Sequence, residues 1–363
     1  MIKGKNILLV SPQIWESRPV SKHHYAKELA KYGAKVFFLN PPNFNVFNIG
    51  KKEERISSNL VLINLFFPLP KVFKFHFTFL FRFILRNYLK HVKKKLSIDI
   101  LWNFDNGSYF EEHHLFSDKL RIFHPVDDFN QSIAGNYNHY NIGFSVSNEI
   151  LAKIQLKKKW FVNHGLNTPE SLEEAKKIQD TKESKGLKVC YLGNLSIRFL
   201  DTDALEAIIR QNKTVSFHFI GDYDVKTDFV VFLENTDNVI LYDKKTGTEL
   251  HRILAKMDIF LLCYKKIEGY FADNSHKILE YLSTGNVIIS SSLSVYKELD
   301  LFPMSVKDDN SDYIELFEKV VQNFSELNSL ALRQKRIAFA QDNTYAKQIE
   351  RIERHLNEAN LKF

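Results

Sequence analysis

Cysteines are scarce in this sequence, and it has no long apolar run. Cys190 and Cys263 are the two cysteines, and both lie in stretches that we expect to be buried strands. We interpret them as small core residues in a reducing compartment rather than as a disulfide. No apolar run reaches the roughly 18 residues that a membrane-spanning helix needs. Because Met1–Asn6 leads straight into an apolar strand, we also expect no signal peptide.

Signatures of several protein classes are missing as well. No G-x-G-x-x-G follows a predicted strand, which argues against a nicotinamide-dependent dehydrogenase. The net charge is +7, but without zinc-ligand spacing or an aromatic RNA-binding motif we expect no nucleic-acid partner. The charge instead suggests a nucleoside diphosphate, an acidic glycan or an anionic membrane surface as the partner.

Strand and helix signals alternate in two separate runs. The first run contains a helical pattern over residues 20–33 and the strands Asn6–Ser11, Lys35–Leu39, Val61–Leu65, Ile98–Asn103, Arg121–His124, Ile142–Val146 and Trp160–Asn163. The second run contains the strands Lys188–Leu192, Ser216–Ile220, Val239–Tyr242, Asp258–Cys263 and Val287–Ser290. After about residue 310 the pattern is helical. Continuous apolar strands between helices are typical of buried parallel sheets.

The length of 363 residues fits two domains of about 150 residues each. We therefore predict an α/β protein with two doubly wound, Rossmann-like domains facing across a cleft, where ligands meet the carboxyl ends of the strands. The predicted parts are an N-terminal domain over 1–165, a polar linker over 166–186, a C-terminal domain over 187–340, and a C-terminal helix over 341–363 that packs back on the N-terminal domain.

The stretch over residues 274–286, just before the last predicted strand, is the most informative part of the sequence. It predicts a short helix that is capped by Asn274 or Ser275 and ended by Gly285. Lys277 and Glu280 share one face near its start. Free N–H groups and a lysine suit a diphosphate, and a carboxylate one turn on can accept the hydroxyls of a ribose. The alternative is a capped amphipathic helix with a surface Lys–Glu pair.

This stretch resembles the N-P-x-K-x-x-E-Y-L-A-x-G-x-P-V-V segment of two-domain (GT-B) glycosyltransferases. Ser275 stands at the usual Pro, and Asn286-Val287 at the usual Lys-Pro. The resemblance extends over nearly the whole chain and is strongest to family 4-like bacterial enzymes of teichuronic-acid and xanthan assembly. It implies donor contacts through Gly193, Arg198, Tyr242, Glu268, Asn274, Ser275, Lys277 and Glu280.

The loop after the first strand, residues 11–24, resembles the W-x-x-x-R-P or S-x-x-H loop of the same enzymes. It forms a cationic turn at a strand end, and we expect it to bind an anionic acceptor or the donor phosphates. The residues concerned are Arg18, Lys22, His23 and His24. The alternative is a solvated start of the following helix.

Residues 123–129 resemble the family's Y-D-x-x-D-D-[FW] segment. A carboxylate after this strand can act as general base on an acceptor hydroxyl. Asp127 is the first candidate and His124 the second. The alternative is that Asp127 and Asp128 cap the next helix.

Two D-x-D patterns, Asp201-x-Asp203 and Asp222-x-Asp224, look like the metal site of single-domain glycosyltransferases. Both come just after a strand and a glycine, where Asp commonly caps a helix or starts a turn. We therefore expect neither a metal nor another cofactor, because lysine, arginine and a helix start can neutralise the leaving diphosphate.

Residues 66–95 hold eight Phe and eight Lys or Arg, and no acidic residue. The alternating Phe of residues 73–83 formally fit a strand, but the continuation fits a helix, which we favour for most of the segment. Aromatic, basic helices lie on anionic membranes, so we expect this segment to contact one. The alternative is a core helix with a basic outer face.

Together these features predict a metal-independent glycosyltransferase of the hexosyltransferase type. Its donor would be a UDP- or GDP-linked sugar, and its acceptor a glycan or lipid-linked hydroxyl. We expect it in the cytoplasm, peripheral on the inner face of the cell membrane, in bacterial polysaccharide biosynthesis. One alternative is a non-catalytic GT-B membrane scaffold or partner subunit, and a weaker one is a nucleotide-sugar epimerase.

Overall fold

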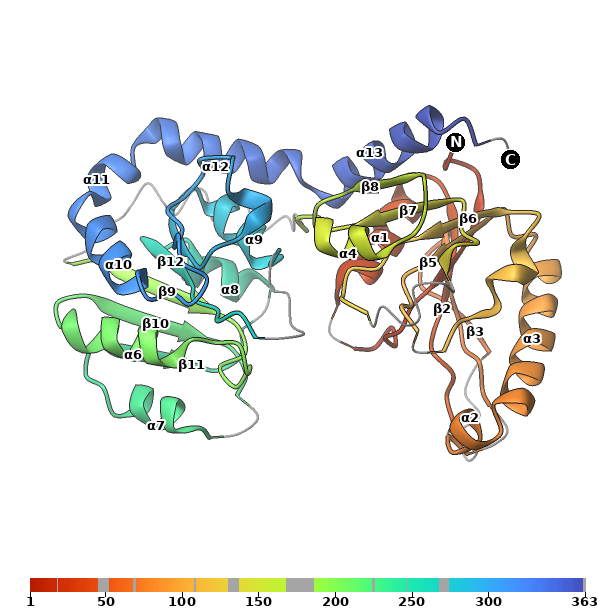
Figure 1. The fold of residues 1–363 in the computed structure, drawn as a ribbon, viewed down its shortest axis with the longest axis horizontal. Helices are drawn as coiled ribbons and strands as arrows, with labels where there is room; N and C mark the ends of the chain where they lie inside the picture. The colour runs from red at the N-terminus through yellow and green to blue at the C-terminus, as the bar shows by residue number, and fades with distance from the viewer. Residues whose placement is uncertain are drawn as a thin grey trace. The chain divides into compact units, whose positions relative to one another are not determined.

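The computed structural model describes residues 1–17, 19–44, 52–67, 70–107, 109–129, 137–167, 186–223, 226–245, 247–267 and 274–361. The chain divides into two compact units (Figure 1). The first unit is Met1–Gly165 together with Tyr345–Phe363, and the second is Leu166–Thr344. Most of the predicted linker lies outside the described residues. Each unit is described by itself.

The first unit contains an eight-stranded sheet in the order β3-β4-β2-β1-β5-β6-β7-β8. Its strands are β1 (Asn6–Val10), β2 (Lys35–Leu39), β3 (Glu53–Arg55), β4 (Leu60–Ile63), β5 (Ile100–Asn103), β6 (Leu120–Phe123), β7 (Ile142–Ser145) and β8 (Lys159–Phe161). The pairings are parallel except between β3 and β4. The sequence did not predict β3, because its three residues are exposed and charged and carry no apolar pattern.

The second unit contains a five-stranded parallel sheet in the order β11-β10-β9-β12-β13. Its strands are β9 (Lys188–Leu192), β10 (Ser216–Ile220), β11 (Val239–Tyr242), β12 (Ile259–Leu262) and β13 (Val287–Ser290). These strands confirm the five predicted from the sequence. The central residues of β9, β10, β12 and β13 are buried, as expected when helices cover both faces of a sheet, whereas those of the edge strand β11 are partly exposed.

Helices follow most of the strands (Figure 1). Those of the first unit are α1 (Ser21–Lys31), α2 (Phe73–His76), α3 (Thr78–Lys95), the short 3-10 helix η1 (Glu112–Phe116), α4 (Asn148–Lys153) and α13 (Tyr345–Glu358). Those of the second unit are α6 (Thr202–Gln211), α7 (Asp228–Glu234), α8 (Gly247–Leu254), α9 (Lys277–Thr284), η3 (Ser294–Tyr296), α10 (Tyr313–Gln322), α11 (Phe324–Leu327) and α12 (Leu330–Asp342). Residues beyond 310 are thus largely helical, as predicted.

Helices cover both faces of the first sheet. Alternate residues of a strand point to opposite faces, so each strand contributes to two cores. Ile7 and Leu9 pack in one core with residues of α1 and α13. Leu8 and Val10 pack in a second core with residues of α3 and α4. The C-terminal helix α13 therefore belongs to the first unit, although the second unit precedes it in the sequence.

The strand order of each sheet reverses beside its first strand. In the second unit, β10 and β11 lie on one side of β9, and β12 and β13 lie on the other. In the first unit, β2 and β4 lie on one side of β1, and β5 to β8 on the other. Ligands of such sheets bind where the order reverses, outside the carboxyl ends of the two central strands. These two places, after β9 and β12 and after β1 and β5, position the candidate site.

Candidate functional site

In the second unit, β9 and β10 are each followed directly by a glycine that no other residue could replace without a shift of its neighbours. Gly193 has φ +152° and Gly221 has φ +153°, values that L side chains rarely adopt. A Cβ on Gly193 would overlap the Nζ of Lys277, and a Cβ on Gly221 would overlap the carbonyl oxygen of Gly193. Gly193 therefore lets the ammonium group lie directly over the end of β9.

Two tyrosines hold the ammonium group of Lys277 at this place. Its Nζ donates a hydrogen bond of 2.7 Å to the Oη of Tyr264, the second residue after β12. The same Nζ lies 5.1 Å from the ring centroid of Tyr191 and 5.4 Å from that of Tyr264, within cation–π range. The structure thus brings one cation to the point where the strand order reverses.

Helix α9 presents Lys277 because its other face is anchored in the core. Tyr281 stacks on Phe260 of β12 with a centroid distance of 4.5 Å and an interplanar angle of 11°. Its hydroxyl accepts a 3.0 Å hydrogen bond from the backbone N–H of Leu192. Glu280 is half-buried and lies on the same side of the helix as Lys277.

The predicted end of this helix is confirmed, and its predicted start is wrong. Gly285 terminates α9 with φ +75°. The N-cap is His276, without a side-chain cap, rather than Asn274 or Ser275. The Asn274 side chain instead accepts a hydrogen bond of 3.1 Å from Tyr296. The backbone carbonyls of Ser275 and His276 accept the first N–H groups of the turn, so no side-chain cap is required there.

The remaining predicted donor residues lie at different strand ends. Arg198 is exposed in the loop after β9. Tyr242 ends β11, and its hydroxyl lies 3.0 Å from the Nδ1 of His218, on whose ring it stacks. Burial lowers the pKa of His218 to about 4, which leaves this ring uncharged near neutral pH. Glu268 lies outside the described residues.

One of the two D-x-D patterns is explained by helix capping. Asp201 is the N-cap of α6, and its Oδ1 accepts from the backbone N–H of Ala204 at 3.3 Å, which confirms the capping interpretation. Its other oxygen accepts from the side-chain amide of Asn310 at 3.0 Å. In the second pattern Asp222 forms an ion pair of 2.8 Å with Lys244, and Asp224 lies outside the described residues.

In the first unit, the structure brings together two residues that the sequence placed in separate motifs. Lys22 on α1 is 1% exposed, and its Nζ lies 3.5 Å from the Oδ2 of Asp127, whose side chain is 68% exposed. Burial lowers the pKa of Lys22, while the charges of Asp127 and Asp105 oppose the shift. The lysine orients an exposed carboxylate, and that carboxylate remains open to an acceptor.

Two other aspartates have structural partners: Asp128, next to Asp127 in the sequence, and Asp105, whose charge also acts on Lys22. Asp128 accepts hydrogen bonds of 2.5 Å from Lys153 and 2.8 Å from the N–H of Phe129. Asp105 follows β5, is fully buried, and accepts from the N–H groups of Tyr109 and Phe110. Among these three carboxylates, Asp127 is therefore the most exposed, since Asp128 is half-buried and Asp105 fully buried. Residues 130–136, where the capping alternative would place a helix, lie outside the described residues.

The predicted roles of His23 and His24 as anion ligands need correction. The Nδ1 of His23 accepts from the N–H of Val20 at 3.1 Å, and its Nε2 lies 3.1 Å from the carbonyl oxygen of Ile14. Both ring nitrogens thus hold the loop after β1 in place. His24 stacks on Tyr345, and burial together with Lys27 lowers its pKa to about 4. Burial also lowers the pKa of His23, so the surroundings of both rings favour the uncharged form. Arg18 lies outside the described residues.

His124 is a core residue rather than a second candidate base. Its ring is fully buried among aromatic side chains, with centroid distances of 4.8 Å to Phe104 and 5.1 Å to Tyr25. Its Nδ1 accepts from the indole N–H of Trp102 at 3.3 Å. Burial, reinforced by the charge of His164, lowers its pKa to about 3. A group without exposed atoms is not positioned to take a proton from an acceptor hydroxyl.

This assignment of His124 predicts a measurable pH dependence. The unfolded chain protonates this histidine below about pH 6.5, while the native state keeps it neutral down to about 3, so acid favours unfolding. Between about pH 7 and about pH 5, wild type should lose about 2 kcal/mol of unfolding free energy relative to His124→Gln, which cannot titrate. Denaturant unfolding at the two pH values checks this. Loss of sugar transfer in a folded His124→Gln protein would restore His124 as a base.

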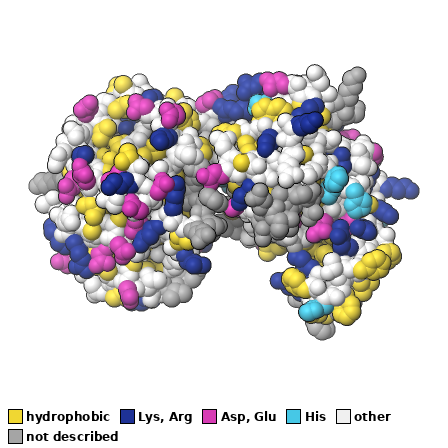
Figure 2. All heavy atoms as spheres, viewed as in Figure 1, with side chains coloured by type: hydrophobic (Ala, Val, Ile, Leu, Met, Phe, Trp, Pro, Cys, Tyr) yellow, Lys and Arg dark blue, Asp and Glu magenta, His cyan; other side chains and the backbone are white. Residues whose placement is uncertain are grey.

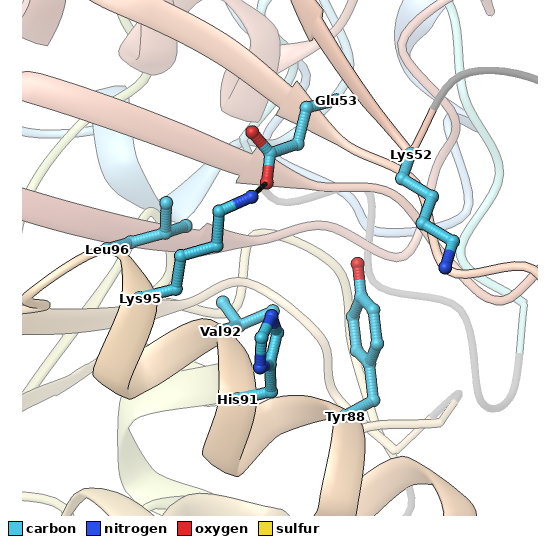
Figure 3. A pocket seen from close by; sticks show the side chains of 7 residues that line it. All are labelled: Lys52, Glu53, Tyr88, His91, Val92, Lys95 and Leu96. Carbon is cyan, nitrogen blue, oxygen red and sulfur yellow. Dashed lines mark hydrogen bonds and ion pairs between the residues drawn. The ribbon is translucent and has the colours of Figure 1, made fainter.

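A separate pocket lies beside the last turns of α3 (Figure 3). It has a volume of about 250 Å³, and Lys52, Glu53, Tyr88, His91, Val92, Lys95 and Leu96 line it. Lys95 and Glu53 form an ion pair of 2.6 Å within it. It contains none of the predicted site residues, and its lining comes from the β3 edge of the sheet and from α3. We therefore do not place the chemistry there.

In each unit, residues outside the predicted set of site residues lie beside the predicted ones. Tyr191 and Tyr264 surround Lys277, and Asp105 lies near Lys22. Tyr264 and Asp105 each come two residues after a strand. That position could be predicted from the sequence. The order of the strands could not, and it is this order that brings the two residues beside the first strand of each sheet.

No protein-family model matches this sequence, and no curated protein matches it either. Solved structures do resemble it. The sucrose-phosphate synthase of Thermosynechococcus elongatus superposes with a TM-score of 0.71 at 13% identity, covering 98% of this chain and 100% of that one. An E. coli structure described as trehalose-6-phosphate bound with UDP-2-fluoro glucose gives 0.68 at 10% identity, covering 99% and 100%. A glycosyltransferase of Rickettsia africae gives 0.66 at 13% identity, covering 99% of each chain.

These identities are low, so the likeness defines the fold alone. It extends over almost the full length of both partners in each comparison. It agrees with the two reversing parallel sheets of this chain. The predicted fold class is therefore confirmed: the chain has the GT-B fold, two Rossmann-like α/β units in one polypeptide.

Proposed function

We propose that this protein is a glycosyltransferase that moves a sugar from a nucleoside diphosphate sugar to an acceptor hydroxyl. One observation carries the proposal: the ammonium group of Lys277 is held over Gly193, the residue that follows β9, where the strand order of the second unit reverses. A fixed cation at such a place suits the diphosphate of a nucleotide. The shared fold with a protein bound with UDP-2-fluoro glucose supports the same ligand class.

The donor would bind in the second unit. Lys277 would contact the diphosphate, with Arg198 as a second cation because it is exposed in the loop after β9. Glu280 would accept hydrogen bonds from the ribose, since it lies one turn from Lys277 on the same side of α9. The nucleobase would lie near Tyr242, at the end of β11. These cations would neutralise the leaving diphosphate without a metal.

The acceptor would bind in the first unit, where Asp127 would be the general base. The acceptor oxygen forms a bond to the anomeric carbon of the donor sugar, and its proton passes to the Asp127 carboxylate. The bond between that carbon and the diphosphate oxygen breaks, and the electron pair leaves with the diphosphate. Lys22 would keep the carboxylate oriented for this step, because it forms an ion pair with it from a buried position.

The acceptor would be a lipid-linked or polysaccharide glycan. This narrower statement rests on the resemblance to teichuronic-acid and xanthan assembly enzymes, on the net charge of +7 and on the basic, Phe-rich residues 66–95. It would place the protein peripherally on the inner face of the cell membrane. The donor class does not depend on it.

A nucleotide screen with one variant tests the proposal. Wild type should bind either UDP or GDP and the corresponding sugar, measured by thermal shift and calorimetry. Glu280→Ala should leave the fold intact and weaken this affinity by about 10- to 150-fold, the equivalent of the roughly 1.5–3 kcal/mol of a charge-assisted hydrogen bond.

The matched control is Glu326→Ala. It removes an exposed glutamate of the same unit that lies on α11, far from α9 in the sequence. It should bind like wild type. If wild type binds no nucleotide, the chain is a GT-B scaffold or partner subunit instead. If Glu280→Ala folds normally and keeps full affinity, Glu280 does not contact the ribose.

A further inference from the structure

Large apolar side chains are exposed at the corner where α2 meets α3. This aromatic corner consists of Val72, Phe75, Phe77, Phe79, Leu80 and Phe83. Phe79 is 82% exposed and Phe75 65%. Figure 2 shows yellow apolar side chains gathered over this end of the first unit, with dark blue cationic ones beside them. Single exposed apolar residues are ordinary, but a contiguous group of this kind marks an interaction surface.

Helical spacing divides the phenylalanines between core and solvent. On α3, Phe81, Leu85, Leu89 and Val92 face the core. Phe79 and Phe83 are four residues apart and face outward, as do Lys90 and Lys94 further along. The exposed face of α3 is thus aromatic at its start and cationic towards its end.

Ion pairs to η1 hold the start of α3 in place. Glu112 is fully buried and accepts from the Nε of Arg82 at 3.0 Å and from the Nε of Arg86 at 2.7 Å. Arg82 also pairs with Glu111 at 3.0 Å. Removing a partner from such a buried carboxylate is costly, so the corner is fixed to the first unit and its rings stay presented to solvent.

The charged side chains that residues 66–95 themselves contribute are all basic, and the acidic residues beside them, Glu111 and Glu112, are paired with Arg82 and Arg86. Residues 66–95 contain no acidic side chain, and Lys71, Lys90 and Lys94 are exposed. Such a face attracts an anionic surface. That surface does not have to be a protein face rich in carboxylates. A symmetric contact with a second copy would place these lysines against their own equivalents, which disfavours a dimer through this face.

We propose that the aromatic corner inserts into an anionic lipid bilayer, with the rings below the headgroups and the lysines among them. Aromatic side chains at the interface and cations near anionic lipid are the two contributions that such binding needs. No helix in the described part of the chain combines the length and the apolar content needed to cross a membrane.

The corner also lies near the proposed acceptor edge of the first unit. Phe81 near the start of α3 packs against Phe44 and Phe67, which follow the carboxyl ends of β2 and β4, with centroid distances of 6.1 Å and 4.8 Å. An acceptor carried on a lipid in the same bilayer would thus be presented beside the carboxyl ends of the strands. This last step rests on the proposed function, whereas the insertion itself does not.

Co-sedimentation with vesicles tests the apolar contribution. Wild type should sediment with phosphatidylglycerol-containing vesicles, and a fraction should stay bound at high salt. Phe75→Ser/Phe77→Ser/Phe79→Ser should lose that salt-resistant fraction. The control Val231→Ser/Val306→Ser/Leu330→Ser removes three exposed apolar residues of the second unit and should sediment like wild type. Phe81 is not substituted, because it is buried.

A second pair of variants tests the charge. Lys71→Gln/Lys90→Gln/Lys94→Gln and Lys213→Gln/Lys256→Gln/Lys307→Gln both lower the net charge from +7 to +4. At low salt the variant of residues 71, 90 and 94 should bind vesicles about 100-fold more weakly than wild type. Each lysine near the membrane surface contributes a factor of about five, and the three factors multiply. The second variant should change vesicle binding little, because its lysines belong to the other unit.

A label at position 79 tests insertion itself. Cys190 and Cys263 are buried, so Phe79→Cys can be labelled selectively with an environment-sensitive fluorophore. Its emission should shift to the blue with anionic vesicles, and that of labelled Val306→Cys should not.

Three results would overturn the proposal: wild type remaining in the supernatant at low salt, binding without the shift at position 79, or a dimer that the triple Phe variant disrupts. None of them concerns nucleotide binding. Failure of the donor screen with intact vesicle binding would instead contradict only the proposed function.

Discussion

Asp127→Asn should lower the rate of sugar transfer by about 10²- to 10⁴-fold while nucleotide binding stays at the wild-type level. The amide keeps the shape of the carboxylate but cannot accept the proton of the acceptor hydroxyl. The ion pair with Lys22 is lost as well. Because Lys22 is buried, some loss of stability is expected. Turnover should therefore be measured per folded protein, with donor affinity determined on the same sample.

The adjacent residue provides the control for this substitution. Asp128→Asn removes a carboxylate that pairs with Lys153 at 2.5 Å and caps the N–H of Phe129. It should lower stability and leave the rate per folded molecule near that of wild type. If Asp127→Asn turns over at a near-normal rate, Asp127 is not the base, and the proton must go to another group.

Lys277→Met should weaken nucleoside diphosphate binding and lower kcat by about 10²- to 10³-fold, the effect of removing one donor from a developing anion. Methionine retains the apolar stem between Tyr191 and Tyr264 but leaves no ammonium over Gly193. The larger effect on rate than on binding is expected because negative charge accumulates on the diphosphate as it departs. Steady-state kinetics and calorimetry on the same variant separate the two effects.

Binding of the free nucleoside distinguishes a phosphate contact from a general disturbance of the site. Lys277→Met should bind the nucleoside as wild type does and lose affinity only for the diphosphate. Lys213→Met, an exposed lysine of the same unit, should leave both affinities unchanged. Equal losses for nucleoside and diphosphate would mean that the substitution disturbs α9 and that Lys277 does not contact phosphate.

The elements of the sheets could be predicted because their signal is local. A continuous apolar run such as Lys188–Leu192 has few ways to be buried other than as a central strand. Gly285 ended α9 as predicted, since it adopts the left-handed conformation that glycine favours. The edge strand Glu53–Arg55 has no such signal, because it forms only by pairing with Leu60–Ile63.

The candidate site could be predicted only in part, because function depends on burial and strand order. His124 and Asp127 are three residues apart, yet one is enclosed by aromatic rings and the other is exposed to solvent. No sequence pattern separates them. The pairing of Lys22 with Asp127, across more than one hundred residues, follows from the parallel order of the strands around β1. The phenylalanines of residues 75–83 likewise divide into core and surface only once the helix is placed.

In the proposed function, a nucleoside diphosphate binds at the carboxyl ends of β9 and β12. The most direct test is a crystal structure with the nucleoside diphosphate that binds most tightly in the screen. We expect its diphosphate within hydrogen-bond distance of the Nζ of Lys277 and its ribose beside Glu280. A nucleotide bound elsewhere, for example in the pocket beside Tyr88 and Lys95, would contradict it.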